Sequence, residues 1–198
     1  MRLADLTALA DLTLRNPPAA MAALRGLRLT MADRWGLLAL AVSLSALLAG
    51  LLALAVPAEA ADAALVALMR HPLTVASLQV AGMTIAAWLM AAVGRLFRGD
   101  GTFADALLVL AWIDLILLAA QLVQLAAVFV LPPLADLVGL ATLGLYAYLV
   151  IRMTAALHGF RHLPLVALGI VATMIVTGFV LAVILAILGH GQPMEVLS

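Results

Sequence analysis

The chain has 198 residues, of which 67% are apolar and only 10% are charged. A soluble domain is about half apolar and about a quarter charged, so the composition excludes a soluble fold and indicates an integral membrane protein. There is no cysteine, which excludes a disulfide framework, a thiolate nucleophile and a cysteine-bound metal. The net charge is zero and the basic residues are dispersed, so we expect no nucleic-acid partner.

The first 34 residues form an arm that holds five arginines and three aspartates. Asn16 followed by Pro17 is typical of a helix start. Apolar residues then recur at helical spacing at Met21, Leu24, Leu27 and Met31. This pattern predicts a short amphipathic helix on the membrane surface, the alternative being a helix that runs straight into the first span. Arg34 and Trp35 favour the surface helix, because they resemble a boundary at headgroup level.

Five apolar stretches follow, each long enough to cross a bilayer: 35–56, 73–94, 103–131, 134–157 and 163–189. They predict an all-α bundle of five transmembrane helices over 35–189, preceded by the arm 1–34 and followed by a short outward tail, 190–198. Ala58-Glu59-Ala60 imitates a signal-peptidase site, but the apolar run before it exceeds the usual ~7–15 residues, so we expect no cleavage. A short surface helix is expected over 62–70.

Local signals mark the ends of the later spans. Thr102 is expected to cap the third helix, with Asp105 at its third position in an arrangement like a capping box. Pro132-Pro133 should stop that helix and start the next one. Gly159 and Pro164 predict a turn before the last span.

The arginines predict the orientation. With five spans, nine of the ten arginines fall on one side of the membrane and only Arg70 falls on the other. The positive-inside rule therefore predicts a cytoplasmic N-terminus and an outward C-terminus. All basic residues are arginine, and Ala and Leu abound, which is typical of a GC-rich bacterial genome. We therefore predict the bacterial inner membrane, with the C-terminus in the periplasm.

One carboxylate lies deep in the third span. Asp114 is 11 residues past Phe103, hence about 16 Å along the helix and near the midplane. Burial disfavours its charged form, so without a nearby cation we expect it to be protonated. Each span can offer one polar side chain at this level, a candidate layer of Ser45, Thr84, Asp114, Tyr146 and Thr173. The layer is interpreted mainly as packing hydrogen bonds of about 0.6 kcal/mol each, the alternative being a path for protons or solutes.

Other polar and small residues carry weaker hypotheses. Gln121 and Gln124 are expected to face the bundle. Arg152 lies about 8 Å inside its span, so we expect it to extend to the surface or to pair with Asp105 rather than Asp114. Three glycines would permit close helix approach, namely Gly144, Gly169 and Gly178.

Metal-binding and catalytic signatures are not evident. His158 and His162 have a spacing that can bind metal on a helix, but the turn between them and the lack of nearby carboxylates argue against a site. The sequence contains no phosphate loop, nucleophile elbow or metalloprotease motif. We therefore expect no enzyme, no cofactor and no metal. Nothing in the sequence predicts a homo-oligomer.

Five short motifs together are typical of one known family: Leu14-Arg15-Asn16-Pro17, Phe97-Arg98-Gly99-Asp100-Gly101-Thr102-Phe103, Ala104-Asp105-Ala106-Leu107, Ala111-Trp112 and Leu131-Pro132-Pro133. In these motifs the chain resembles the Yip family of five-span membrane proteins, in its bacterial branch, and the likeness covers roughly residues 12–189. The resemblance implies the five-span fold and the same orientation. Eukaryotic members act in vesicle traffic with Rab-type GTPases and usually have a longer cytoplasmic N-terminal region. A bacterial chain has no obvious Rab partner, so the Rab-binding role is not carried over.

Two functional hypotheses follow, one from the resemblance and the hinges and the other from the polar midplane layer. The first is a non-catalytic membrane protein whose arm and cytoplasmic hinges contact membrane lipids or partner proteins. The candidate hinge contacts are Arg95, Arg98, Asp100, Asp105, Arg152, His158 and Arg161. The second is a small transporter or channel subunit that uses Asp114. Transporters usually contain inverted repeats, and five spans cannot divide into equal halves, which favours the first hypothesis.

Overall fold

The computed structural model describes residues 3–55 and 68–189, and in these ranges the chain forms helices and no strand. The helices in order are α1 (Leu3–Arg15), α2 (Pro17–Gly26), α3 (Met31–Ala55), α5 (Pro72–Leu96), α6 (Phe103–Val130), α7 (Pro132–His158) and α8 (Leu163–Gly189). Within the described ranges, five helices (α3 and α5 to α8) are long and apolar enough to cross a membrane. The predicted all-α, five-span membrane fold is therefore confirmed.

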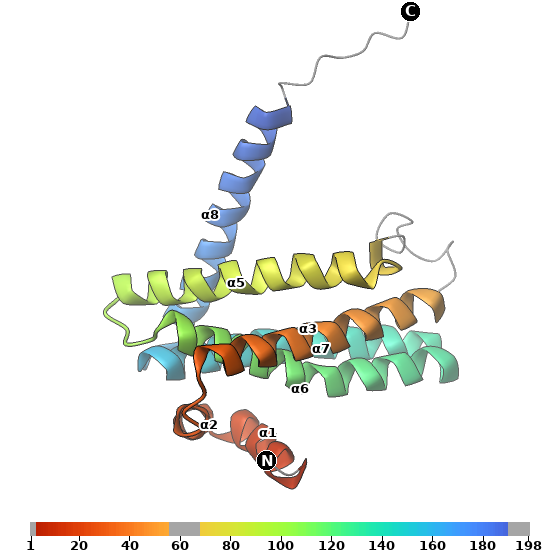
Figure 1. The fold of residues 1–198 in the computed structure, drawn as a ribbon, viewed down its shortest axis with the longest axis horizontal. Helices are drawn as coiled ribbons and strands as arrows, with labels where there is room; N and C mark the ends of the chain where they lie inside the picture. The colour runs from red at the N-terminus through yellow and green to blue at the C-terminus, as the bar shows by residue number, and fades with distance from the viewer. Residues whose placement is uncertain (1–2, 56–67, 190–198) are drawn as a thin grey trace, which may run out of the picture.

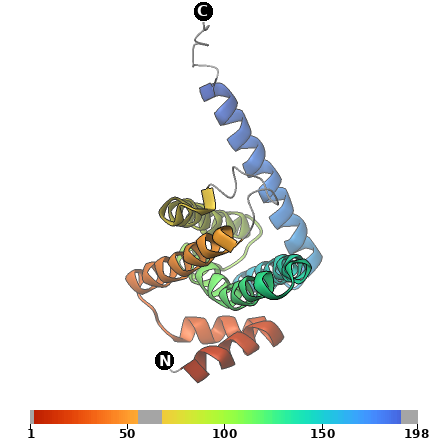
Figure 2. The same cartoon turned by 90° about the vertical axis from the view of Figure 1, so that its right-hand side faces the viewer.

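Four of these helices, α3, α5, α6 and α7, run side by side (Figure 1), and the view along them shows how they group (Figure 2). Helix α6 is the central one, since it contacts α3, α5 and α7 and is the most buried. Its residues Leu108 and Ile113 are fully buried with Leu38 of α3 and with Leu149 and Met153 of α7. We call this set of four helices the bundle.

Helix α8 leaves the bundle at a steep angle after the turn that follows α7 (Figures 1 and 2). Its packing is mainly against α7. Large apolar side chains between positions 163 and 180 are exposed, among them Leu165, Leu168, Met174 and Phe179. In an integral membrane protein such a surface suits contact with lipid.

The N-terminal arm contains two helices, where the sequence predicted one. Helices α1 and α2 lie together against one side of the bundle, with α2 running across the direction of α6 (Figure 1). The indole Nε1 of Trp112 in α6 donates to Oγ1 of buried Thr13 at 2.9 Å, and the Tyr148 hydroxyl of α7 donates to the Leu14 carbonyl at 2.9 Å. These hydrogen bonds hold α1 on α6 and α7.

The predicted start of the amphipathic helix is confirmed, but its predicted extent is wrong. Asn16 caps α2 by accepting a hydrogen bond from the Ala19 amide, with Pro17 at the first helical position. The helix ends at Gly26, and Arg28 adopts a left-handed φ of 48° that no α-helix continues through.

A second local signal then starts α3 at Met31, before the predicted boundary at Trp35. The Thr30 hydroxyl accepts from the Asp33 amide at 3.2 Å, and the Asp33 carboxylate accepts from the Thr30 amide at 2.8 Å. This reciprocal pair is a capping box, which satisfies two backbone donors at the helix start. Met31 therefore opens a span instead of completing the surface helix.

The other predicted boundaries follow local chemistry. Thr102 Oγ1 accepts from the Asp105 amide at 3.1 Å and so caps α6 as expected. Helix α6 ends at Val130 and α7 begins at Pro132. Gly159 ends α7 in the left-handed region, with φ 72°. The predicted features at 58–60 and 190–198, and most of 62–70, lie outside the described residues.

Candidate functional site

The two loops after α5 (97–102) and after α7 (159–162) lie at the same end of the bundle, here called the hinge end. At its centre the carboxylate of Asp105 binds two arginines from other helices. Its Oδ1 accepts from Arg34 Nη1 at 2.9 Å, and its Oδ2 accepts from Arg25 Nε at 3.1 Å. Arg25 also donates through Nη2 to the Leu157 carbonyl at 3.2 Å. This network joins α2, α3, α6 and α7.

The ion pair of Asp105 with Arg34 is well shielded from solvent, and the pair with Arg25 is partly exposed. The side chains of Asp105 and Arg34 are 14% and 13% exposed, whereas that of Arg25 is 41% exposed. Asp105 also lies in the first turn of α6, where the positive end of the helix dipole favours a carboxylate. Of the two alternatives expected for Arg152, extension to the surface or pairing with Asp105, the pairing is not observed, because Arg25 and Arg34 occupy both carboxylate oxygens.

His158, the last residue of α7, is almost fully buried in a cradle of three glycines. A Cβ at Gly94, Gly99 or Gly101 would lie less than 3.0 Å from the imidazole, a separation that real side chains do not adopt. The Gly101 amide donates to Nδ1 at 3.1 Å, so the neutral ring carries its proton on Nε2 and donates it to the Met90 carbonyl at 3.1 Å. The ring thus connects α7 to α5 and to the loop before α6.

The glycines reach the ring because of how α5 ends. The Gly99 amide donates to the Gly94 carbonyl at 2.9 Å and the Arg98 amide donates to the Arg95 carbonyl at 3.0 Å. This pair of hydrogen bonds is a Schellman motif, which ends a helix with one residue in the left-handed conformation, directly before the residue that makes the longer of the two bonds. Here that residue is Arg98, with φ 63°. The motif turns the chain back so that Gly99 and Gly101 lie against His158.

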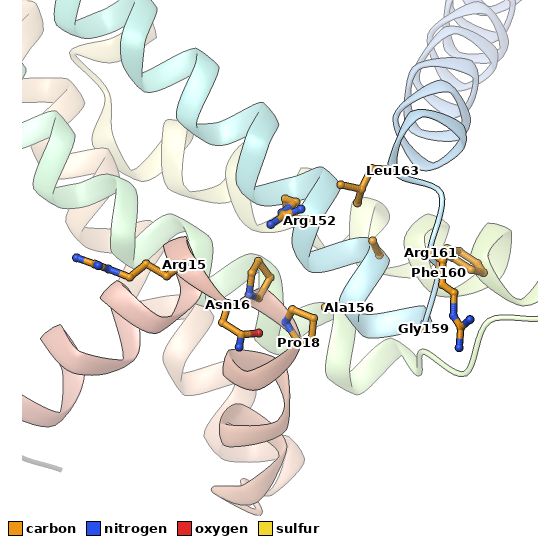
Figure 3. Close-up of a pocket in the computed structure, with 11 residues that line it drawn as sticks. Arg15, Asn16, Pro18, Arg152, Ala156, Gly159, Phe160, Arg161 and Leu163 are labelled. Atoms are coloured by element: carbon orange, nitrogen blue, oxygen red, sulfur yellow. The ribbon is translucent and has the colours of Figure 1, made fainter.

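A cavity of about 490 Å³ opens at the hinge end between the α1–α2 junction, α7 and the start of α8 (Figure 3). Three arginines from different segments line it, namely Arg15, Arg152 and Arg161. Arg152 points over the space between Asn16 and Ala156 in Figure 3, whereas Arg15 and Arg161 lie on opposite sides and extend outward. The Nε of Arg152 is buried without a hydrogen-bond partner among the described residues, and its guanidinium lies 5.6 Å from the centroid of the Tyr148 ring.

The remaining hinge candidates face outward. Arg95, Arg98, Asp100 and Arg161 are exposed, and Arg95 Nε donates to the Ala91 carbonyl at 3.1 Å. Of the seven predicted hinge residues, Asp105 and His158 instead form the internal network. His162 is exposed and His158 uses both ring nitrogens. Among residues 3–55 and 68–189, no three His, Asp or Glu side chains are grouped as metal ligands would be.

The midplane carboxylate has partners from two helices. Ser45 of α3 donates to Asp114 Oδ2 at 3.1 Å, and Gln79 Nε2 of α5 lies 3.2 Å from the same oxygen. Tyr146 of α7 borders a cavity of about 230 Å³ next to Asp114 and Gln79. The structure therefore brings together Ser45, Asp114 and Tyr146 from the predicted layer and adds Gln79.

Two members of the predicted layer do not join it. Thr84 Oγ1 donates to the Val80 carbonyl and Thr173 Oγ1 donates to the Gly169 carbonyl, each at 2.7 Å within its own helix. A threonine hydroxyl in a helix can donate its hydrogen bond to the carbonyl four residues earlier. An equal depth in the membrane was therefore not sufficient to predict a shared site. Thr173 is also on α8, which lies outside the bundle (Figure 1).

The prediction that two glutamines face the bundle agrees with the structure, whereas the prediction of close helix approach at three glycines does not. Gln121 and Gln124 are half-buried, as expected for side chains that face the bundle. Gln124 lies against Gly139 of α7, where an added Cβ would be 2.8 Å from its amide nitrogen. The glycines proposed for close approach have nothing within 4 Å of an added Cβ: Gly144, Gly169 and Gly178. Close approach occurs at Gly139 and in the His158 cradle instead.

Comparison with known protein families settles the relationship of the chain. The model of the Yip1 domain matches residues 12–185, which is most of the length of this chain. The chain belongs to the Yip1 family. No curated protein and no solved structure matches it. The Yip1 match extends from α1 into α8 and includes the Asp105 network, the His158 cradle and the Asp114 cluster.

Some residues of this Yip1-family site were not singled out from the sequence. Arg25 was one of the five arginines counted in the arm, Arg34 was interpreted only as part of a boundary at headgroup level, and no hypothesis was attached to Gln79. The recurrence of glycine at positions 94, 99 and 101 was the available signal for a tightly packed loop. That signal does not identify the side chain to which the glycines adapt, since His158 is more than 50 positions away.

Proposed function

We propose that this Yip1-family protein is a non-catalytic adaptor of a bacterial inner membrane that binds partner proteins at its hinge end, which faces the cytoplasm. The observation that carries the proposal is the network around Asp105 and His158, which connects α2 and α3 to α6, and the end of α7 to α5 and to the loop before α6. The excess of arginine at this end supports the cytoplasmic orientation.

The network also leaves a charged surface free for contact. Arg95, Arg98, Asp100 and Arg161 are exposed on loops or helix ends that the network holds in place. A surface that is ordered before binding loses less conformational entropy when a partner binds. A fixed hinge end with outward charges is therefore suited to protein recognition.

Crosslinking from the hinge end tests the adaptor. The chain has no cysteine, so single cysteines can be introduced without further changes. Asp100→Cys and His162→Cys place exposed thiols on the two hinge loops, and Asp136→Cys places an exposed thiol near the opposite end as a matched control. In cells, a thiol-reactive crosslinker should capture the same partner from positions 100 and 162 and not from 136. In spheroplasts, a membrane-impermeant maleimide should label only position 136.

The opposite labelling pattern would overturn the proposed orientation. Repeated crosslinking without a shared partner at positions 100 and 162, under conditions where both thiols react, would overturn the adaptor.

A transporter role is the second candidate, and the cavity of about 230 Å³ beside Asp114 favours it. An ionisable residue inside a membrane protein commonly marks an ion or proton path. However, hydrogen bonds from Ser45 and Gln79 already satisfy this carboxylate, as expected for a packing role.

Asp114→Asn separates these two functions. The amide has the same shape and retains hydrogen bonding to Ser45, so for an adaptor we expect near-wild-type expression and unchanged proton flux in reconstituted vesicles. Protein-free vesicles give the background. A flux that exceeds this background in the wild type and disappears in Asp114→Asn would support the transporter and count against the adaptor.

A further inference from the structure

Of the residues that line the cavity at the hinge end, the adaptor proposal uses only Arg161, and the lining has an unusual charge. Arg15, Arg152 and Arg161 contribute to it from α1, α7 and the loop before α8, and no aspartate or glutamate is among its lining residues. Arg15 pairs with Asp11 at 2.7 Å, but both side chains are largely exposed, so this ion pair is weak and exchangeable. The cavity is therefore a region of unbalanced positive charge.

Among the three arginines, Arg152 is the one placed over the cavity. Its Nε is buried and has no acceptor among the described residues, although buried donors are normally paired. Its guanidinium is oriented by the Tyr148 ring, and Figure 3 shows it above the space between Asn16 and Ala156. Arg152 as a whole is only half-buried and lines the cavity, so an oxygen-rich anion there would provide acceptors for its guanidinium. Guanidinium groups bind phosphate well, because their planar donors match its oxygens.

The position of the cavity and its apolar lining indicate that the phosphate belongs to a lipid. The cavity lies where α7 ends and α8 begins, and both helices are candidate membrane spans. Its remaining lining is largely apolar, with Pro17, Ala155 and Leu163 among the residues. Beyond it, Leu165 and Leu168 expose apolar side chains on α8, along which acyl chains can lie. A soluble phosphate compound would make no use of this apolar surface.

We propose that this cavity binds the phosphate headgroup of an anionic phospholipid, with Arg152 as the central ligand and Arg15 and Arg161 closing over it from the sides. A volume of about 490 Å³ is within the range of small-molecule sites. Arg15 and Arg161 extend outward and are exposed, so no packing prevents them from turning toward a bound anion. The proposal relies on the proposed orientation only to place the lipid in the cytoplasmic leaflet.

Native mass spectrometry of the purified full chain tests the site. Phosphatidylglycerol and phosphatidylcholine with the same acyl chains are added separately, and the bound fraction is measured over a concentration series. The wild type should retain one phosphatidylglycerol in preference to phosphatidylcholine. Arg152→Gln should weaken phosphatidylglycerol binding about tenfold, the expected loss of one charge-assisted contact. Arg95→Gln, an exposed arginine outside the cavity, should leave binding unchanged.

Two further measurements make the test decisive. The double variant Arg15→Gln/Arg161→Gln alters only exposed side chains, so it should fold even if Arg152→Gln does not, and it should also weaken phosphatidylglycerol binding. Equal binding of both lipids, or equal loss in Arg95→Gln, would overturn the site. Displacement of the lipid by inorganic phosphate at similar concentration would assign the cavity to a soluble phosphate compound instead. Because no partner protein is present, these outcomes are independent of the crosslinking result.

Discussion

Gly94→Ala is expected to lower the free energy of unfolding by about 2 kcal/mol or more, because overpacking a filled site costs about 1–3 kcal/mol and sometimes more. The added methyl would overlap the imidazole of His158, which the amide of Gly101 and the carbonyl of Met90 hold in place. The overlap should outweigh the gain of about 1 kcal/mol that alanine normally brings to a helix. The apparent melting temperature in detergent measures this effect.

Gly144→Ala is the matched control for this prediction. Gly144 is also in a long helix, but an added Cβ there has nothing within 4 Å, so its melting temperature should stay the same or rise. Combining Gly94→Ala with His158→Ala provides a second check, since removal of the ring should abolish the extra cost of the methyl group. If Gly94→Ala behaved like Gly144→Ala, the glycine cradle would not constrain the hinge end.

Asp105→Asn is expected to destabilise the protein by roughly 2 kcal/mol. Removing one partner of a fully buried ion pair costs about 3–5 kcal/mol, and the partial exposure of Arg25 lowers this value. Two guanidiniums would lose their shared carboxylate, and the contacts between α2, α3 and α6 would weaken. Thermal unfolding in detergent at low and high salt measures the change, and high salt should not reproduce it, because shielded pairs are little screened.

The arm supplies a control for the Asp105 prediction. Asp11 pairs with Arg15 in the open, with side chains 58% and 79% exposed, so Asp11→Asn should change stability by less than about 0.5 kcal/mol. Arg34→Gln should cost more than Arg25→Gln, because Arg34 is the less exposed of the two arginines. Equal and small effects at Asp105 and Asp11 would contradict a structural role for the network.

The sequence determined the features that depend on local chemistry and on length. Apolar stretches longer than the bilayer core predicted the five spans, because only helices satisfy their own backbone in lipid. The caps at Asn16 and Thr102 were predictable because each acts on an amide three residues away. The Thr30–Asp33 capping box is equally local, and its omission moved the predicted start of α3.

The tertiary structure decided how these spans are used. Helical rise gave the depth of Asp114 and Thr84, but depth does not fix the rotation of a helix about its own axis. Packing turned Gln79 toward Asp114 and left Thr84 bonded to its own helix. Asp105 likewise binds arginines that are 71 and 80 positions away in the chain, and His158 accepts from the Gly101 amide, which is 57 positions away. Such contacts form only when the helices pack, because close approach selects which buried donors and acceptors can meet.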